Sequence, residues 1–163
     1  MIEIYDTTLR DGAQSRDVNF SLQDKLRITA KLDEFGMAFV EGGWPGSNPK
    51  DKEYFRRVRD LPLRNAKVVA FGSTRRSGIP SSSDANLNAI VASGTGTATL
   101  FGKAWDLHVA QVLKTTPREN LEMVYDSVQY LRGHGLEVIF DAEHFYDGFR
   151  SKPAYALEVV KAA

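Results

Sequence analysis

The chain alternates between strand-like and helix-like segments, and this alternation restricts the fold more than any other feature. The segments that read as strands are residues 1–8, 37–42, 66–71, 97–101 and 136–141. The segments that read as helices are residues 21–35, 48–60 and 84–93, a segment running from Thr116 to the glycines at 133–135, and residues 153–161. Such alternation is typical of a parallel sheet covered by helices. The apolar runs at 66–71 and 137–140 fit parallel strands buried on both faces.

Two of these helices begin with recognisable capping signals. Ser21 is followed three residues later by Asp24, and Thr116 is followed at the same spacing by Glu119. At this spacing the hydroxyl can accept a hydrogen bond from the backbone N–H of the acidic residue, whose side chain accepts one from the backbone N–H of the capping residue. Pro117 suits the first position of a helix, where its missing N–H is not needed. These signals predict helix starts at residues 22 and 117.

Two closures of the sheet fit this pattern, an open doubly wound sheet and a barrel. No Gly-x-Gly-x-x-Gly motif follows the first strand, and the glycines at 94–96 lack the third member and precede a strand, so a dinucleotide site is not predicted. Five units share 163 residues, whereas a complete barrel has eight units in roughly 250 residues. The pattern leaves two possibilities, five of the eight units of a barrel or a small five-stranded α/β domain.

Composition excludes several classes of function. Lys plus Arg and Asp plus Glu both number 21, so no bulk charge attracts nucleic acid or an anionic membrane. Cysteine is absent, which excludes disulfides, thiolate metal sites and cysteine nucleophiles. No apolar run approaches the roughly 20 residues of a membrane span, and no signal segment precedes the first strand. We therefore expect a soluble cytoplasmic protein without nucleic-acid or membrane partners.

Arg10, Asp11 and Gln14 follow the first strand directly, at the end of a strand where α/β enzymes place their chemistry. A carboxylate in this position can ligate a hard divalent cation, and a neighbouring guanidinium can bind a substrate carboxylate or stabilise an enolate. The same residue types also fit a salt-bridged junction between a strand and a loop. The residues alone leave both interpretations open.

Residues 5–14 resemble the signature of the acyl-condensing metalloenzymes related to 2-isopropylmalate synthase, citramalate synthase, homocitrate synthase and 3-hydroxy-3-methylglutaryl-CoA lyase. After the second strand, Glu41 and the Gly-Trp-Pro sequence at 43–45 match the family's glutamate and Gly-x-Pro turn, and the loop through residue 51 is most similar to the citramalate synthase branch. The resemblance implies an α/β fold of the parallel TIM-barrel type. Residues 1–163 would be the N-terminal part of the catalytic barrel, with about five of its eight βα units and no separate C-terminal regulatory domain.

The resemblance also implies roles for individual residues. Arg10 would be the catalytic arginine, Asp11 a metal ligand and Gln14 a contact of the 2-oxo acid. Glu143 follows the fifth strand, at the position of an acidic residue that is important for catalysis in the family. Asp141 has no assigned role, since related synthases carry other residues at its position.

Asp106 and His108 follow the fourth strand and stand two residues apart, so on extended backbone both could face one ligand. In the resembled family an Asp-x-His sequence here shapes the substrate pocket, and we assign both residues to the pocket wall, with a structural hydrogen bond as an equal alternative. His144 is expected behind the site or at the surface. The pair Arg75-Arg76 is expected in a solvated loop, although the 3′-phosphate of coenzyme A is an alternative partner for such cations.

The implied activity is that of an acyltransferase in branched-chain amino-acid biosynthesis, which condenses acetyl-CoA with a small 2-oxo acid, most simply pyruvate to citramalate. A divalent metal ion (Mg, Mn or Zn) would hold the 2-oxo acid, and the protein would form a homo-oligomer. The family completes its metal site with a His-x-His pair, which none of the three histidines here forms, so we expect the chain by itself to be inactive. A carbon–carbon lyase of the HMG-CoA lyase type and a non-catalytic unit remain as alternatives.

Overall fold

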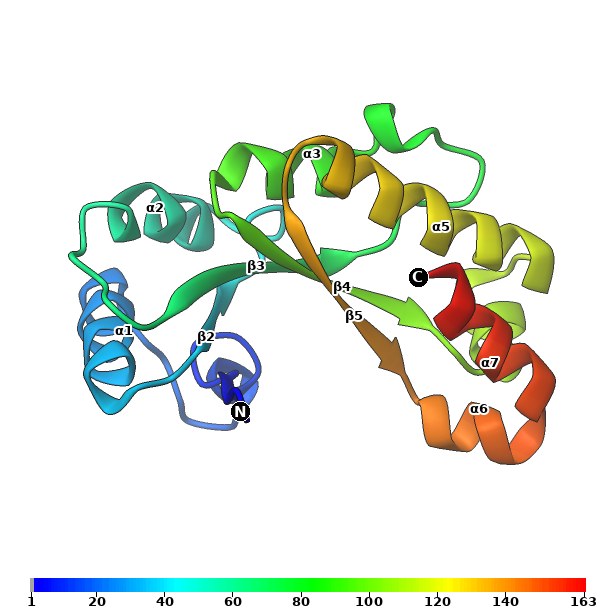
Figure 1. Ribbon diagram of the computed structural model, residues 1–163, viewed down its shortest axis with the longest axis horizontal. Helices are drawn as coiled ribbons and strands as arrows, with labels where there is room; N and C mark the ends of the chain where they lie inside the picture. The colour runs from blue at the N-terminus through cyan, green and yellow to red at the C-terminus, as the bar shows by residue number, and fades with distance from the viewer. Residues whose placement is uncertain (1) are drawn as a thin grey trace. The chain divides into compact units, whose positions relative to one another are not determined.

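A computed structural model describes residues 2–163 and contains one five-stranded sheet. Its strands are β1 (Tyr5–Asp6), β2 (Phe39–Gly43), β3 (Lys67–Ser73), β4 (Thr97–Lys103) and β5 (Glu137–Glu143), and they lie in sequential order (Figure 1). The pairs β1–β2 and β2–β3 are parallel, with Tyr5 opposite Phe39 and Phe39 opposite Lys67. A doubly wound sheet would reverse its strand order part-way. The sequential order is that of the first five βα units of a barrel, which confirms the predicted fold class.

Helical segments connect the strands. They are α1 (Leu22–Phe35), α2 (Pro49–Val58), α3 (Ala85–Ser93), α4 (Asp106–His108), α5 (Pro117–Gly133), α6 (Phe145–Ser151) and α7 (Pro153–Ala162), with the 3-10 turns η1 (Gly12–Gln14) and η2 (Ser81–Ser83) and the π-helical turn η3 (Val109–Leu113). The predicted capping box of α1 is confirmed, since Ser21 and Asp24 exchange both hydrogen bonds. Thr116 caps α5 by accepting from the backbone N–H of Glu119.

The first strand is much shorter than the predicted residues 1–8. The Asp6 carboxylate accepts hydrogen bonds of 3.0 Å from both the backbone N–H and the hydroxyl of Thr8. The carbonyl of Thr7 then accepts from the next turn, including the N–H of Arg10 and of Asp11. Because these local bonds use the backbone groups that a sheet would need, the chain leaves β1 immediately after Asp6.

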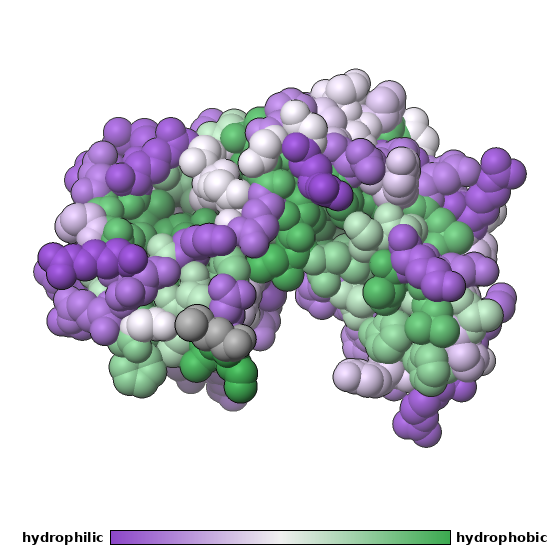
Figure 2. Space-filling model, viewed as in Figure 1, coloured by the Kyte–Doolittle hydropathy of each residue, from purple (hydrophilic) through white to green (hydrophobic). Residues whose placement is uncertain are grey.

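The chain divides into two compact units, which are described separately. The N-terminal unit comprises the chain up to Gly72 together with Ala89–Ala98. Every residue of β2 is buried, and α1 packs against α2. Tyr54 and Phe55 of α2 are completely buried, and their rings meet edge to face at 5.3 Å. Hydrophilic side chains cover the outer face of α1 and α2 (Figure 2). The core of this unit therefore lies between β2 and the two helices.

The C-terminal unit comprises Ser73–Asn88 and Thr99–Ala163. Its α7 packs against α5 and α6 (Figure 1), around a core cluster of Ala104, Val109, Val124, Tyr155 and Val159. Apolar surface is visible over α6 and α7 in Figure 2. Four large hydrophobic side chains of these two helices are exposed: Tyr146, Phe149, Leu157 and Val160.

Candidate functional site

The Arg10 side chain is held in one orientation by three groups of the N-terminal unit. Its Nε donates to Glu41 Oε1 at 2.5 Å, and its Nη1 donates to Asp11 Oδ1 at 3.2 Å. The guanidinium also lies over the Phe71 ring, 3.9 Å from its centroid. Its Nη2 has no hydrogen-bond partner within residues 2–163. A guanidinium fixed on two sides, with a donor left over, is well suited to bind a carboxylate or an oxyanion.

Glu41 is the buried carboxylate that orients Arg10. It is only 1% exposed, and besides Arg10 it accepts a 2.5 Å hydrogen bond from the Tyr5 hydroxyl. A charge this deeply buried is tolerated because an ion pair and a hydrogen bond compensate for its lost hydration. The family resemblance indicated a glutamate at this position, but the contact between Glu41 and Arg10 joins residues that are 31 apart in the chain.

Arg10 and Gln14 line one cavity of about 280 Å³, together with Lys25, Trp44, Lys50 and Asp51. The structure thus places two of the predicted site residues against the same space. Asp11 lies beside them in sequence and is 62% exposed at its side chain, so it can be reached by solvent and by ions. Gln14 closes the turn η1, where its backbone N–H donates to the Asp11 carbonyl at 2.9 Å.

A buried ion pair between Lys25 and Asp51 supports the wall of this cavity. Their Nζ and Oδ1 atoms are 2.5 Å apart, and burial lowers the pKa of Lys25, with the Asp51 carboxylate opposing that change. The second oxygen of Asp51 accepts from the backbone N–H of Trp44 at 3.0 Å and from the Asn48 amide at 3.2 Å. Asp51 therefore ties the β2–α2 loop to α1, which sequence reasoning did not foresee because the pair joins two separate helices.

In the C-terminal unit, Glu143 is the last residue of β5 and forms an ion pair with Lys103, the last residue of β4. The backbones of the two strands are joined just beyond this pair, where the Ala104 N–H donates to the Glu143 carbonyl at 3.2 Å. The predicted catalytic carboxylate thus stands at the carboxyl end of a strand. Lys103 was not predicted as its partner.

Asp106 and His108 do not lie on extended backbone, which was the condition for both to face one ligand. Both residues lie in the short helix α4, where side chains two positions apart point in different directions. The Asp106 carboxylate accepts from the backbone N–H of Leu107 at 3.0 Å, a local bond that favours the turn. Their role in a pocket wall stays a prediction, but they do not face one ligand from an extended segment.

His108 instead contacts two aromatic rings. Its ring centroid lies 4.7 Å from that of Trp105 and 4.7 Å from that of His144, the latter at an interplanar angle of 79°. His144 follows β5, so this contact brings together the loops after β4 and β5. His144 is exposed, as one of its two expected positions required. Nothing in the sequence predicts its contact with His108, 36 positions away.

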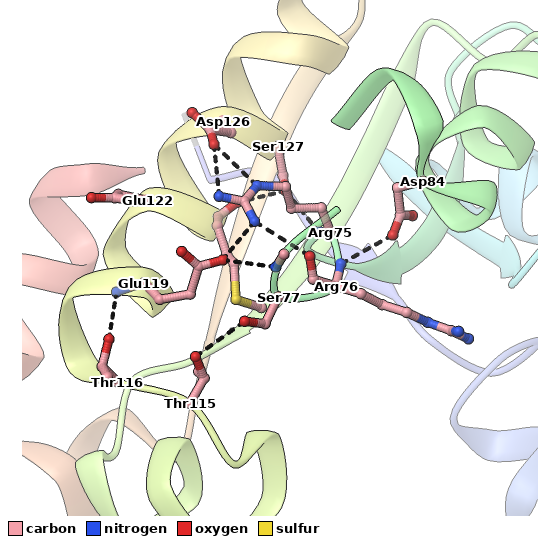
Figure 3. Close-up of polar contacts among 12 residues, drawn as sticks. Arg75, Arg76, Ser77, Asp84, Thr115, Thr116, Glu119, Glu122, Asp126 and Ser127 are labelled. Atoms are coloured by element: carbon pink, nitrogen blue, oxygen red, sulfur yellow. Dashed lines mark hydrogen bonds and ion pairs between the residues drawn. The ribbon is translucent and has the colours of Figure 1, made fainter. Parts of the chain in front are cut away.

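The prediction of a solvated loop for Arg75-Arg76 is correct for only one of the two residues. Arg76 is exposed, but Arg75 is buried and binds two acidic residues of α5, with Glu119 and Asp126 each 2.8 Å from its guanidinium (Figure 3). The backbone N–H of Arg75 donates to Ser127 Oγ, and that of Gly78 donates to Glu119. The Arg75 guanidinium also lowers the pKa of Glu119. This network fixes the loop that follows β3 onto α5.

Comparisons with known proteins identify the family of this chain. The family model described as HMGL-like matches residues 1–163. The chain belongs to the HMGL-like family. Its 162-residue match to (R)-citramalate synthase of Aquifex aeolicus is 53% identical, and that to the enzyme of Sulfolobus acidocaldarius is 50% identical. Each match covers 99% of this chain and 31% of the relative, so the chain spans about a third of the length of these curated relatives.

Solved structures support the fold of this HMGL-like chain. Hydroxymethylglutaryl-CoA lyase from Pseudomonas aeruginosa superimposes with a TM-score of 0.71 at 20% identity, covering 99% of this chain and 54% of the lyase chain. An HMG-CoA lyase from Acenitobacter baumannii in complex with coenzyme A and 3-methylmalate superimposes with a TM-score of 0.70 at 14% identity, covering 99% of this chain and 53% of the lyase chain. At these identities the likeness establishes the fold alone.

Two further findings concern the described part of the HMGL-like chain. Across residues 2–163, no three histidine, aspartate or glutamate side chains gather closely enough to hold a metal ion. In the same part of the chain, every helix is too short or too polar to cross a membrane. Asp11 is therefore a single exposed carboxylate rather than a member of a complete ligand set.

Proposed function

We propose that this chain forms the first five βα units of the catalytic barrel of an acyltransferase, which condenses acetyl-CoA with pyruvate to give citramalate. The observation that carries the proposal is the Arg10 guanidinium, which Glu41 and Asp11 hold while Nη2 is left for a ligand oxygen. The choice of citramalate synthase is supported by relatives of that name at about 50% identity, since a probable 2-isopropylmalate synthase of Methanosarcina acetivorans is 30% identical.

In this proposal Arg10 binds the negatively charged oxygens of the 2-oxo acid and stabilises the alkoxide that forms at its keto carbon. Gln14, which lines the same cavity, orients the acid through its amide. Glu143 accepts a proton from the methyl carbon of acetyl-CoA, with Lys103 holding its carboxylate in place. Asp106 and His108 contribute to the wall of the substrate pocket.

A divalent metal ion belongs to the activity that the family resemblance implies, and Asp11 is the residue we propose as its ligand. The described residues do not by themselves fit such an ion, because hard divalent cations need several oxygen or nitrogen ligands and no three histidine, aspartate or glutamate side chains of residues 2–163 gather to hold one. We therefore derive no step through the metal. The remaining ligands would come from sequence that the longer relatives possess beyond the matched third.

A chimera tests the proposal directly. The 162 matched residues of Aquifex aeolicus (R)-citramalate synthase would be replaced by those of this chain, and release of free CoA from acetyl-CoA would be followed with and without pyruvate. We expect CoA release that depends on pyruvate and falls by at least about a hundredfold in the Arg10→Gln chimera. A folded chimera that cleaves 3-hydroxyacyl-CoA instead would establish the lyase alternative, and one without either activity would contradict the proposal.

A further inference from the structure

Three aromatic side chains of the C-terminal unit gather beyond the carboxyl ends of β4 and β5. His108 packs between Trp105 and His144, and the Trp105 and His144 ring centroids are 6.2 Å apart. Gly148 of α6 permits the close packing beneath this cluster, because a Cβ at that position would lie 2.4 Å from the Ala104 carbonyl oxygen. The cluster is therefore built by close backbone packing between the β4–α4 loop and α6.

Two features of the cluster are unfavourable in the chain as it stands. The Nδ1 atom of His108 is buried and has no hydrogen-bond partner among residues 2–163. A buried polar atom without a partner loses its hydrogen bonds to water and gains none within the protein, so such atoms are rare in folded proteins. His144, whose ring contacts His108, has left-handed backbone with a φ of 55°, which is uncommon for a residue with a side chain. Unfavourable features that coincide in this way are found at functional sites.

The cluster adjoins the backbone of Glu143, the residue whose carboxylate we propose as the proton acceptor. Glu143 immediately precedes His144, and its carbonyl accepts from the N–H of Ala104, the residue before Trp105. A ligand whose methyl carbon reaches the Glu143 carboxylate has its carbonyl oxygen only two bonds from that carbon. In this inference the oxygen lies at the imidazole cluster, which is joined to Glu143 through the backbone.

We propose that His108 donates a hydrogen bond from Nδ1 to the carbonyl oxygen of the acetyl-CoA thioester; this assignment rests on the proposed function. The C–H bond of the methyl group breaks as its proton passes to Glu143. The electron pair moves to the thioester oxygen, and the resulting enolate is stabilised by the imidazole N–H until its methylene carbon attacks the keto carbon.

His144 acts as a positioning residue in this proposal. Its Nδ1 lies 3.3 Å from Asp147 Oδ2, and its side chain is 48% exposed, so the ring can swing toward solvent. Since His108 Nδ1 is buried while the rings are packed, the thioester oxygen gains access when the His144 ring moves aside. The ligand then supplies the partner that Nδ1 lacks.

The binding test compares acetyl-CoA with S-ethyl-CoA, a thioether in which a methylene replaces the carbonyl. We expect the 163-residue chain to bind acetyl-CoA about three to ten times more tightly than the thioether, the range for one hydrogen bond. Acetyl-CoA, but not the thioether, should shift the ¹⁵N resonance of His108 Nδ1. Only three histidines contribute signals, and His134, whose Nδ1 contacts the Tyr130 carbonyl, serves as an internal reference.

Three variants separate this role from a structural one. His108→Phe keeps a ring between Trp105 and His144 but removes the donor, and should bring the two affinities to equality. His108→Asn places an amide near the position of Nδ1 and should restore most of the preference. His134→Phe is the matched control and should leave the preference unchanged, and circular dichroism would check that each variant is folded.

Equal affinities in the unmodified chain, no binding of either compound, or a preference that survives His108→Phe would each overturn the assignment to His108. A preference abolished by His108→Phe and restored by His108→Asn would establish it. The proposed function is judged independently by the chimera. Pyruvate-dependent CoA release there, with no thioester preference here, would leave the function standing and remove only this inference.

Discussion

The orientation of the Arg10 side chain depends on a carboxylate of β2, since Glu41 accepts the hydrogen bond from its Nε. Changing Glu41 to Gln removes the buried charge and leaves the guanidinium with only the exposed Asp11 as an ionic partner. We expect the free energy of unfolding to fall by about 3 kcal/mol, since breaking one side of a buried ion pair is strongly destabilising. Urea unfolding of the two proteins would measure this difference.

The matched control is Glu34→Gln, in which an exposed glutamate loses its pair with Lys31. An exposed pair of this kind contributes at most about 0.5 kcal/mol. If the two glutamate variants were destabilised equally, Glu41 would not have the part in holding Arg10 that the geometry assigns to it.

Gly43 is the second residue on which the site depends. Its φ is 143°, and a Cβ there would lie 2.6 Å from the carboxyl group of Asp51. We expect Gly43→Ala to lower the free energy of unfolding by about 2–4 kcal/mol, through backbone strain and displacement of Asp51. Gly133→Ala, at the end of α5 with open space around it, should instead stabilise by about 0.5–1 kcal/mol. Thermal unfolding of both would show whether the signs differ.

At the scale of elements, α1 is joined to the start of β3 through one side chain. Asp33 accepts hydrogen bonds of 2.7–3.0 Å from the backbone N–H groups of Arg64, Asn65 and Ala66. These donors, that of Ala66 above all, hold the pKa of Asp33 below its usual range. An acid whose pKa is lowered by folding stabilises the protein at pH values above its pKa in the unfolded chain, which is about 3.9 for aspartate. This stabilisation is lost as the pH falls through the lower pKa of the folded state.

Asp33→Asn should therefore destabilise the chain by about 2 kcal/mol at pH 7, because the amide cannot accept three N–H groups equally well. The difference in unfolding free energy between this variant and the unmodified protein should shrink as the pH falls below about 4, since Asp33 of the unmodified protein then becomes protonated. Urea unfolding at several pH values would measure both. Asp60→Asn, on an exposed residue, is the control, and a pH-independent difference for Asp33→Asn would contradict the role of the charge.

The elements that could be predicted from sequence are those with local signals. α1 and α5 begin with Ser21 and Thr116 caps and carry apolar residues at helical spacing, and both helices were predicted within a residue or two at their starts. The segment from Asp106 to Leu113 has no comparable cap, and it forms α4 and a π-helical turn that were not predicted. β1 was overestimated at its C-terminal end because Asp6 and Thr7 form local hydrogen bonds with residues 8–12 in place of bonds to a neighbouring strand.

At the scale of the whole molecule, a motif of neighbouring residues led to the prediction of Arg10, Asp11 and Gln14 as site residues, whereas the sequence did not predict contacts between distant residues. The pairing of Glu41 with Arg10, of Lys25 with Asp51 and of His108 with His144 joins residues more than twenty positions apart. Such contacts are fixed by the strand order and by packing between elements, for which residue spacing carries no direct signal. The βα alternation, repeated five times, predicted a parallel sheet covered by helices, and the family resemblance implied the barrel type.

The last prediction concerns metal binding by the whole chain. Since residues 2–163 bring no three acidic or histidine side chains together for an ion, Asp11 alone should bind Mn²⁺ weakly, with a dissociation constant on the order of millimolar. Asp11→Asn should abolish this binding, while Asp60→Asn should leave it unchanged; electron paramagnetic resonance of free Mn²⁺ would measure both. Tight, micromolar binding that depends on Asp11 would mean that further ligands exist in this chain, and it would contradict the proposal that the longer relatives supply them from beyond the matched third.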